Sequence, residues 1–148
     1  MRWNHYYDST KGVSHLSYRH YWDNYDIRAE TLTAEYVQPL SHGWTIAPLV
    51  RYHTQTAAKF YLDVEPNSGA LPTFPAFDAK YFSEDQRLSA YGALTLGIKV
   101  SKEIDQDWTV DFKYEEYRQK GSWAWSEGSP GLDTFRFRSF QYGISRKF

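Results

Sequence analysis

The chain has 148 residues and a formal net charge of −1, so it can bury the core of one domain and lacks the basic excess that suits a nucleic acid. It has no cysteine, which excludes disulfides, thiolate metal sites and a catalytic thiol. Mean hydropathy is −0.69 and no apolar run approaches the roughly 20 residues of a membrane-spanning helix, yet 19% of the residues are aromatic. Transmembrane β-barrels combine these properties, because only alternate strand residues face lipid and aromatic residues collect at the interfaces.

Seven segments of the chain alternate between an apolar and a polar side with a period of two, as β-strands with two different faces do. We expect strands at Arg2–Tyr7 and at about 16–22, 32–40, 44–62, 88–100, 108–117 and 134–148. In general they are longer than the usual strand of about 5–6 residues, and several reach the roughly 9–11 residues that cross a bilayer when tilted. The pattern predicts no helix.

The expected connections alternate in length. Residues 8–12, 41–43 and 103–107 form short turns, whereas 63–86 and 120–133 form long loops rich in glycine, proline and aromatic residues. A tight turn at 23–26 lies on the side of the long loops. Outer-membrane barrels place short turns in the periplasm and long loops outside. If the last strand ends in the periplasm, every short turn falls on that side and every long loop on the other.

The last expected strand carries Phe140, Tyr142 and Ile144 on one side and ends the chain at Phe148. Alternation up to a C-terminal phenylalanine is typical of the last strand of an outer-membrane barrel. We expect Phe148, Tyr142 and Phe140 to form the signal for the barrel-assembly machinery.

The fold class that we predict is all-β, an antiparallel transmembrane β-barrel of the outer-membrane type with about seven to eight meander strands. Residues 1–148 then form one barrel domain or the C-terminal part of a larger barrel. Seven strands would put the N-terminus outside, whereas bacterial single-chain barrels usually have an even number of strands. We therefore expect at least one more strand upstream. The open edges would pair with these missing strands or with another protomer, because unpaired backbone groups are costly in lipid.

Charged residues share the side of the strands that would face the lumen. Buried charges must pair with one another or meet water, so two interpretations stay open: a salt-bridged plug, or a water-filled path whose charges set ion selectivity. The candidate lumen-lining residues are Arg19, Glu35, Arg51, His53, Lys59, Arg87, Lys99, Asp111, Lys113 and Glu115.

Catalytic and metal motifs are weak in this chain. Its five histidines are scattered, no Gly-x-Ser-x-Gly string occurs, and we expect no metal and no cofactor. An outer-membrane hydrolase with Ser, His and Asp on the barrel wall remains an alternative, and it would require His53 or Ser89 for activity. A soluble β-barrel that binds an apolar ligand is the other alternative. The loop aromatics Phe74, Phe77, Trp123 and Trp125 are expected to lie in loops that pack on each other over one mouth of the barrel.

Several strings together resemble the C-terminal part of an uncharacterised family of Gram-negative outer-membrane proteins, filed as a domain of unknown function. They include Tyr18-Arg19-His20-Tyr21, Tyr81-Phe82-Ser83 and Tyr114-Glu115-Glu116-Tyr117, and the most specific is Arg-Tyr-x-x-Gln-x-Ala-Ala-x-Phe-Tyr at Arg51–Tyr61. The resemblance spans roughly Tyr18 to Phe148. It implies an outer-membrane location and a barrel longer than this chain, but no activity. We expect a pore, an export conduit or an envelope scaffold with membrane lipid as its surroundings.

Overall fold

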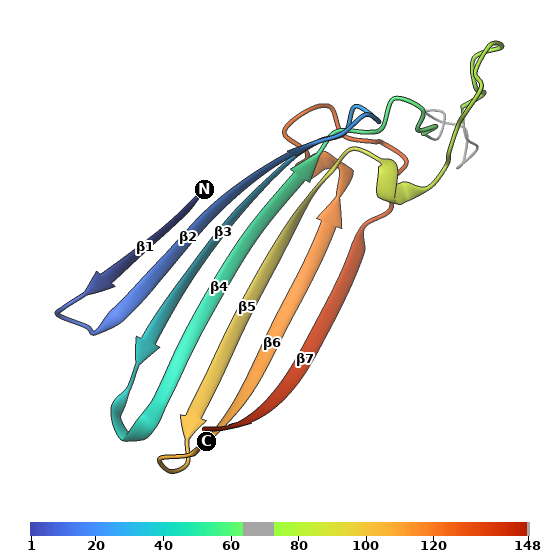
Figure 1. Ribbon diagram of the computed structural model, residues 1–148. Coiled ribbons are helices and arrows are strands. Elements are labelled where there is room, and N and C mark those ends of the chain that lie inside the picture. Colours follow the sequence, from blue (N-terminus) through green and yellow to red (C-terminus); the bar gives the residue numbers. More distant parts are fainter. Residues whose placement is uncertain (64–72, 148) are drawn as a thin grey trace.

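The computed structural model describes residues 1–63 and 73–147, which form one antiparallel sheet of seven strands. Each strand pairs with the next one in the chain, so the sheet is a meander with β1 and β7 at its edges (Figure 1). The strands are β1 (Arg2–Tyr7), β2 (Gly12–Trp22), β3 (Arg28–Pro39), β4 (Trp44–Gln55), β5 (Tyr91–Glu103), β6 (Trp108–Lys120) and β7 (Phe135–Arg146). The all-β meander is confirmed. The sheet is not closed, so a barrel remains a prediction.

In residues 1–63 and 73–147, helical structure is limited to three turns of 3₁₀-helix, η1 (Ser41–Gly43), η2 (Gln86–Leu88) and η3 (Gly121–Trp123). Within the described residues, no helix has the length and apolar character to cross a membrane.

The register between strands aligns apolar side chains of neighbouring strands on one face. Leu32 lies opposite Tyr52, and Val50 lies between Ala34 of β3 and Leu96 of β5. Because side chains alternate between the two faces, a slip of one residue would turn every apolar side chain of a strand to the polar face. We call the face with Leu32, Val50 and Leu96 the apolar face and the opposite one the polar face.

The connections follow the predicted alternation of length. The turns after β1, β3 and β5 and the C-terminal end of β7 lie at one end of the sheet, which we call the turn end (Figure 1). The turn after β2 and the described parts of the two long connections, 56–63 with 73–90 and 121–134, lie at the opposite, loop end. At the turn end, Gly43 has a φ of 72°, a conformation that favours glycine.

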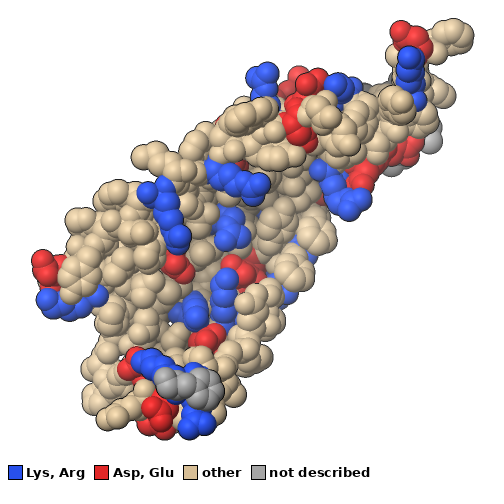
Figure 2. All heavy atoms as spheres, viewed as in Figure 1, with Lys and Arg blue, Asp and Glu red and all other residues tan. Residues whose placement is uncertain are grey.

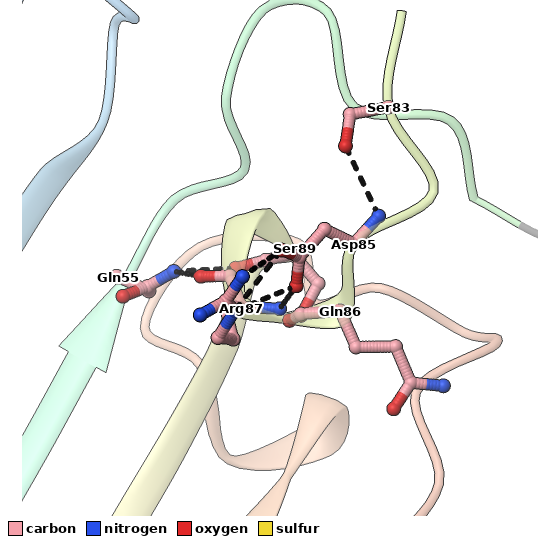
Figure 3. A network of polar contacts seen from close by, with 6 residues as sticks. All are labelled: Gln55, Ser83, Asp85, Gln86, Arg87 and Ser89. Carbon is pink, nitrogen blue, oxygen red and sulfur yellow. Dashed lines mark hydrogen bonds and ion pairs between the residues drawn. The ribbon is translucent and has the colours of Figure 1, made fainter.

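Several predicted strand limits are wrong. β2 begins at Gly12 rather than at about 16, and β3 begins at Arg28 rather than at about 32. The strand expected over 44–62 ends at Gln55, and the one expected to begin at Leu88 begins at Tyr91. The Gln55 amide donates hydrogen bonds of 2.9 Å to the carbonyls of Arg87 and Ser89, which ties the returning chain to the end of β4 (Figure 3). Beyond this point, segment 58–62 bonds to 83–88 of the same connection and leaves the sheet.

The two long connections are joined to each other at the loop end. Ala90 and Ser129 exchange two bonds of 2.9 Å, one between backbone groups and one from the Ala90 N–H to the Ser129 hydroxyl. The Gly131 N–H donates to Asp63 at 3.1 Å. Gly92 allows the second connection to approach β5, because a Cβ there would lie 2.0 Å from the Trp123 carbonyl oxygen. The prediction that the loops pack on each other is thus confirmed for these segments, whereas Phe74 and Phe77 are fully exposed.

Large apolar side chains remain exposed on the apolar face. Leu96 is 53% exposed, Phe140 60% and Tyr142 82%, while the buried apolar residues are mostly alanines. A soluble domain buries such residues, so a continuous exposed apolar surface marks a face that contacts something else.

Candidate functional site on the polar face

Charged side chains of both signs gather along the middle of the polar face, which Figure 2 shows. They come from the strands β2 to β6, and their positions alternate with those of the apolar face. The two halves of this face hold their charges in different ways.

On β5 and β6, four residues form what we call the charge ladder: Lys99, Asp111, Lys113 and Glu115. Lys99 Nζ lies 3.7 Å from Asp111 Oδ1, and Lys113 Nζ lies 3.1 Å from Glu115 Oε1. The two lysines lie directly opposite each other, an arrangement that is unfavourable unless counter-charges lie close by. Asp111 and Glu115 supply them. Glu115 Oε1 is buried and, among the residues that the structure describes, makes no hydrogen bond of good geometry, so the nearby ammonium is its main compensation.

Two glycines give the carboxylates of the charge ladder their space. Gly97 lies opposite Glu115, and a Cβ there would lie 3.1 Å from Glu115 Cγ. Gly143 lies opposite Asp111, and a Cβ there would lie 2.7 Å from Asp111 Oδ1. The alternation of the strands is consistent with both glycines lying on the polar side, but it does not reveal this role, because only the register shows which acid each glycine faces.

On β2 to β4, the cations lie beside hydroxyl groups and rings. Arg51 Nε donates to the Thr33 hydroxyl at 3.4 Å, and Arg19 lies over the Tyr21 ring at 5.8 Å. His53 Nδ1 lies 2.9 Å from the Thr31 hydroxyl. In the described part of the chain, neither Arg19 nor Arg51 forms an ion pair with a carboxylate. We call Arg19 and Arg51 the unpaired arginines.

The structure brings only some of the predicted residues together. Lys99, Asp111, Lys113 and Glu115 form one group, while Arg19, Arg51, His53 and Glu35 share the other half of the face. Glu35 lies opposite Leu49, and no ion pair involves it in residues 1–63 and 73–147.

Lys59 and Arg87 are not on strands, contrary to the prediction, because β4 ends and β5 begins outside them. Lys59 donates to the Asn24 carbonyl at 2.9 Å, and Arg87 binds Asp85 at 2.5 Å (Figure 3). Hydrogen bonds from the Arg87 side chain and its backbone N–H lower the pKa of Asp85 to about 2.

The residues of the predicted assembly signal can be placed in part. Phe140 and Tyr142 lie on the exposed apolar face of β7. Phe148 lies outside the described residues, so its role stays a prediction.

Ser89 and His53, the residues named for a catalytic alternative, do not meet. Ser89 is fully buried and its hydroxyl donates to the Gln86 carbonyl at 2.6 Å. His53 contacts Thr31 and the Tyr91 ring, whose centroid is 5.7 Å away. The Ser89 hydroxyl thus stabilises the turn that precedes β5, and its burial makes it inaccessible to a substrate.

These observations define an all-β protein whose sheet has one exposed apolar face and one charged face. The chain belongs to the family described as "Protein of unknown function (DUF3570)", whose model matches residues 1–137. No curated protein and no solved structure matches the chain.

Proposed function

We propose that this chain forms part of the wall of an outer-membrane β-barrel that acts as a pore or export conduit in a Gram-negative envelope. The observation that carries the proposal is the division of the sheet into an exposed apolar face and a charged polar face. Lipid on one side and water on the other are the surroundings that such a sheet requires.

The dimensions of the strands support a membrane location. The 12 residues of β7 extend about 40 Å at about 3.3 Å per residue, and a tilt of about 40° leaves about 30 Å along the membrane normal. The apolar band of outer-membrane barrels is about 25 Å tall. Strands of this length are sufficient to cross it.

Aromatic and cationic side chains mark the turn end of the apolar face. Lys102 Nζ lies 5.5 Å from the centre of the Trp44 ring, and Arg146 Cζ lies 5.3 Å from that of Trp108. Tryptophan prefers the membrane interface, and long cationic side chains reach from there to water. This arrangement supports an interface at the turn end.

The open edges suggest what completes the wall. The pairing of β1 with β2 reaches Tyr18, so in the described part Arg19–Trp22 have no partner strand on that side. Unpaired backbone groups cost several kcal/mol each in hydrocarbon. We propose that further strands of the same protein, or another copy, pair with β1 and β7 and enclose the polar face.

The first experiment compares far-UV circular dichroism and the gel mobility of unboiled and boiled protein, in detergent micelles and in plain buffer. A β spectrum with a heat-dependent mobility shift, seen only in detergent, supports the membrane proposal. Conductance steps in a planar bilayer would then support a conduit, and an inserted protein without conductance would leave a scaffold.

A cooperative β fold in plain buffer would contradict the membrane proposal and favour a soluble ligand-binding protein. One observation fits that second function: an open groove of about 370 Å³ on the apolar face, lined by Trp3, Leu16, Tyr18, Leu32 and Val50 among others. In a membrane, the same groove would be filled by lipid chains.

A further inference from the structure

Three arginines and one glutamate interrupt the apolar face near the loop end of β6 and β7. This arginine cluster consists of Glu116, Arg118, Arg136 and Arg138. Across the two strands, Glu116 lies opposite Arg138 and Arg118 lies opposite Arg136. Each of these four positions is an even number of residues away from Phe112 on β6 or from Tyr142 on β7. Because strand side chains alternate between faces, the guanidinium groups lie on the apolar side of the sheet.

One carboxylate holds all three guanidinium groups. Glu116 Oε1 accepts from Arg118 Nε at 2.6 Å, while Glu116 Oε2 lies 2.9 Å from Arg136 Nη2 and 3.4 Å from Arg138 Nε. A single negative charge balances one of the three positive charges. Among the described residues, two positive charges remain uncompensated. Arg118 directly faces Arg136, and although Glu116 bridges this pair, a further anion would reduce the repulsion that is left.

The arginines keep donors free for a ligand. Their side chains are 50%, 46% and 53% exposed, whereas that of Glu116 is only 16% exposed. Each guanidinium has five N–H donors in a planar fork, which matches the oxygens of a phosphate. Toward the turn end, the face continues with Phe140, Tyr142 and Ile144, which are 60%, 82% and 73% exposed.

We infer that the arginine cluster binds the phosphate-monoester headgroup of a membrane lipid whose acyl chains lie along Phe140, Tyr142 and Ile144. The charges are complementary, because a phosphate monoester carries about −1.5 to −2 charges at pH 7 and the cluster has two uncompensated positive charges. The inference rests on the proposed function in one respect: the apolar face must contact lipid. The proposed topology then places the site in the outer leaflet, at the depth where charged residues are tolerated.

The test measures lipid retention by native mass spectrometry of the full chain in detergent micelles. The probes are dioleoyl phosphatidic acid, a monoester, and dioleoyl phosphatidylglycerol, a diester. We expect at least fivefold greater retention of the monoester. The variant E116Q/R118Q/R136Q/R138Q should retain at least tenfold less phosphatidic acid than the wild type. E116Q alone should retain more phosphatidic acid than the wild type, because it leaves three positive charges uncompensated.

K102Q/R146Q is the matched control, since it also removes two net positive charges from the apolar face, but at the turn end. It should retain phosphatidic acid as the wild type does. Equal losses of phosphatidic acid retention in the control and the fourfold variant would show that only the net charge matters, and this result would overturn the site. Equal retention of both lipids by the wild type would also overturn it. Displacement of the lipid by millimolar inorganic phosphate would show a site for free anions instead.

The heat-dependent gel shift and the β spectrum are recorded in the same micelles, which separates the two proposals. A wild type that has both signatures but does not prefer the monoester contradicts the lipid site alone. A wild type without them contradicts the membrane proposal and the site that rests on it. If the fourfold variant fails to fold, E116Q decides: unchanged or lower retention would overturn the inference.

Discussion

On β5 and β6, Lys99 and Lys113 lie beside carboxylates, whereas on β2 and β4, Arg19 and Arg51 lie beside hydroxyl groups and rings. The charge ladder compensates its own charges and needs Gly97 and Gly143 to make room for them. The unpaired arginines leave positive charge available to whatever fills the space over the polar face. The first arrangement stabilises the sheet, whereas the second leaves positive charges that can interact with a solute.

The largest expected effect on stability is at Lys113. Lys113→Met leaves the buried oxygen of Glu115 without its ammonium and should lower the free energy of unfolding by about 1–2 kcal/mol. Arg51→Met, on the other half of the face, should change it by no more than about 0.5 kcal/mol. Urea denaturation in detergent micelles measures both. Equal losses of unfolding free energy in the two variants would contradict the proposed difference between the two halves of the polar face.

The next effect is steric. Gly143→Ala places a methyl group against Asp111 Oδ1 and should cost about 1 kcal/mol, because the carboxylate must turn away from Lys99. Ser145→Ala on the same strand is the control and should be close to neutral. The midpoint of thermal unfolding reports both, and an unchanged midpoint in Gly143→Ala would show that Asp111 has room without the glycine.

Ion selectivity sharpens the comparison if the protein conducts. Arg19→Gln/Arg51→Gln should shift the ratio of anion to cation permeability severalfold toward cations, because both arginines lack a carboxylate partner in the described part. Lys99→Gln/Asp111→Asn removes a compensated pair and should change it little. Reversal potentials in a salt gradient provide the measurement. A larger shift in the second variant would assign selectivity to the charge ladder.

The smallest effect concerns Asp85 and Arg87, an exposed ion pair outside the strands. The lowered pKa of Asp85, about 2, means that the folded state favours the ionised carboxyl. The contribution to stability is therefore complete above the unfolded pKa of about 4 and is lost as the pH falls through about 2. The protection of the Arg87 amide hydrogen from exchange, relative to an unstructured peptide at the same pH, should fall over that window in the wild type, and Asp85→Asn should abolish this fall. A dependence that persists in this variant would implicate another group.

The period of two was sufficient to predict the sheet, since each alternating segment contains a strand and Leu32, Val50 and Leu96 share a face as expected. It failed at the loop end, where the alternation of Ala58, Phe60 and Leu62 continues although the strand has ended. There the Gln55 side chain bonds to the Arg87 carbonyl, and the backbone of 58–62 bonds to that of 83–88 instead of to a strand of the sheet. The alternation does not reveal these bonds, because the partners are far apart in the sequence. The same limit applies to Lys59 and Arg87, whose placement depended on the strand ends.

The charges of the polar face were predictable as a set, but their pairing was not. Lys113 and Glu115 are two residues apart on one strand, whereas Asp111 and Lys99 meet across β5 and β6. Only the register decides which of these contacts form. The arginine cluster was not predicted, because Glu116 and Arg118 occupy positions that the alternation assigns to apolar residues.

The joined connections at the loop end have a consequence for a chain that is cut. The segment around Phe77 is exposed, while the bond from Gly131 to Asp63 and those from Gln55 to the carbonyls of Arg87 and Ser89 connect the parts on either side of it. The twelve residue pairs of β4 and β5 connect them as well. A protease that nicks the chain near Phe77 would therefore leave two fragments that stay associated as one particle, and fragments made separately from that site offer a route to a split, self-complementing version of the protein.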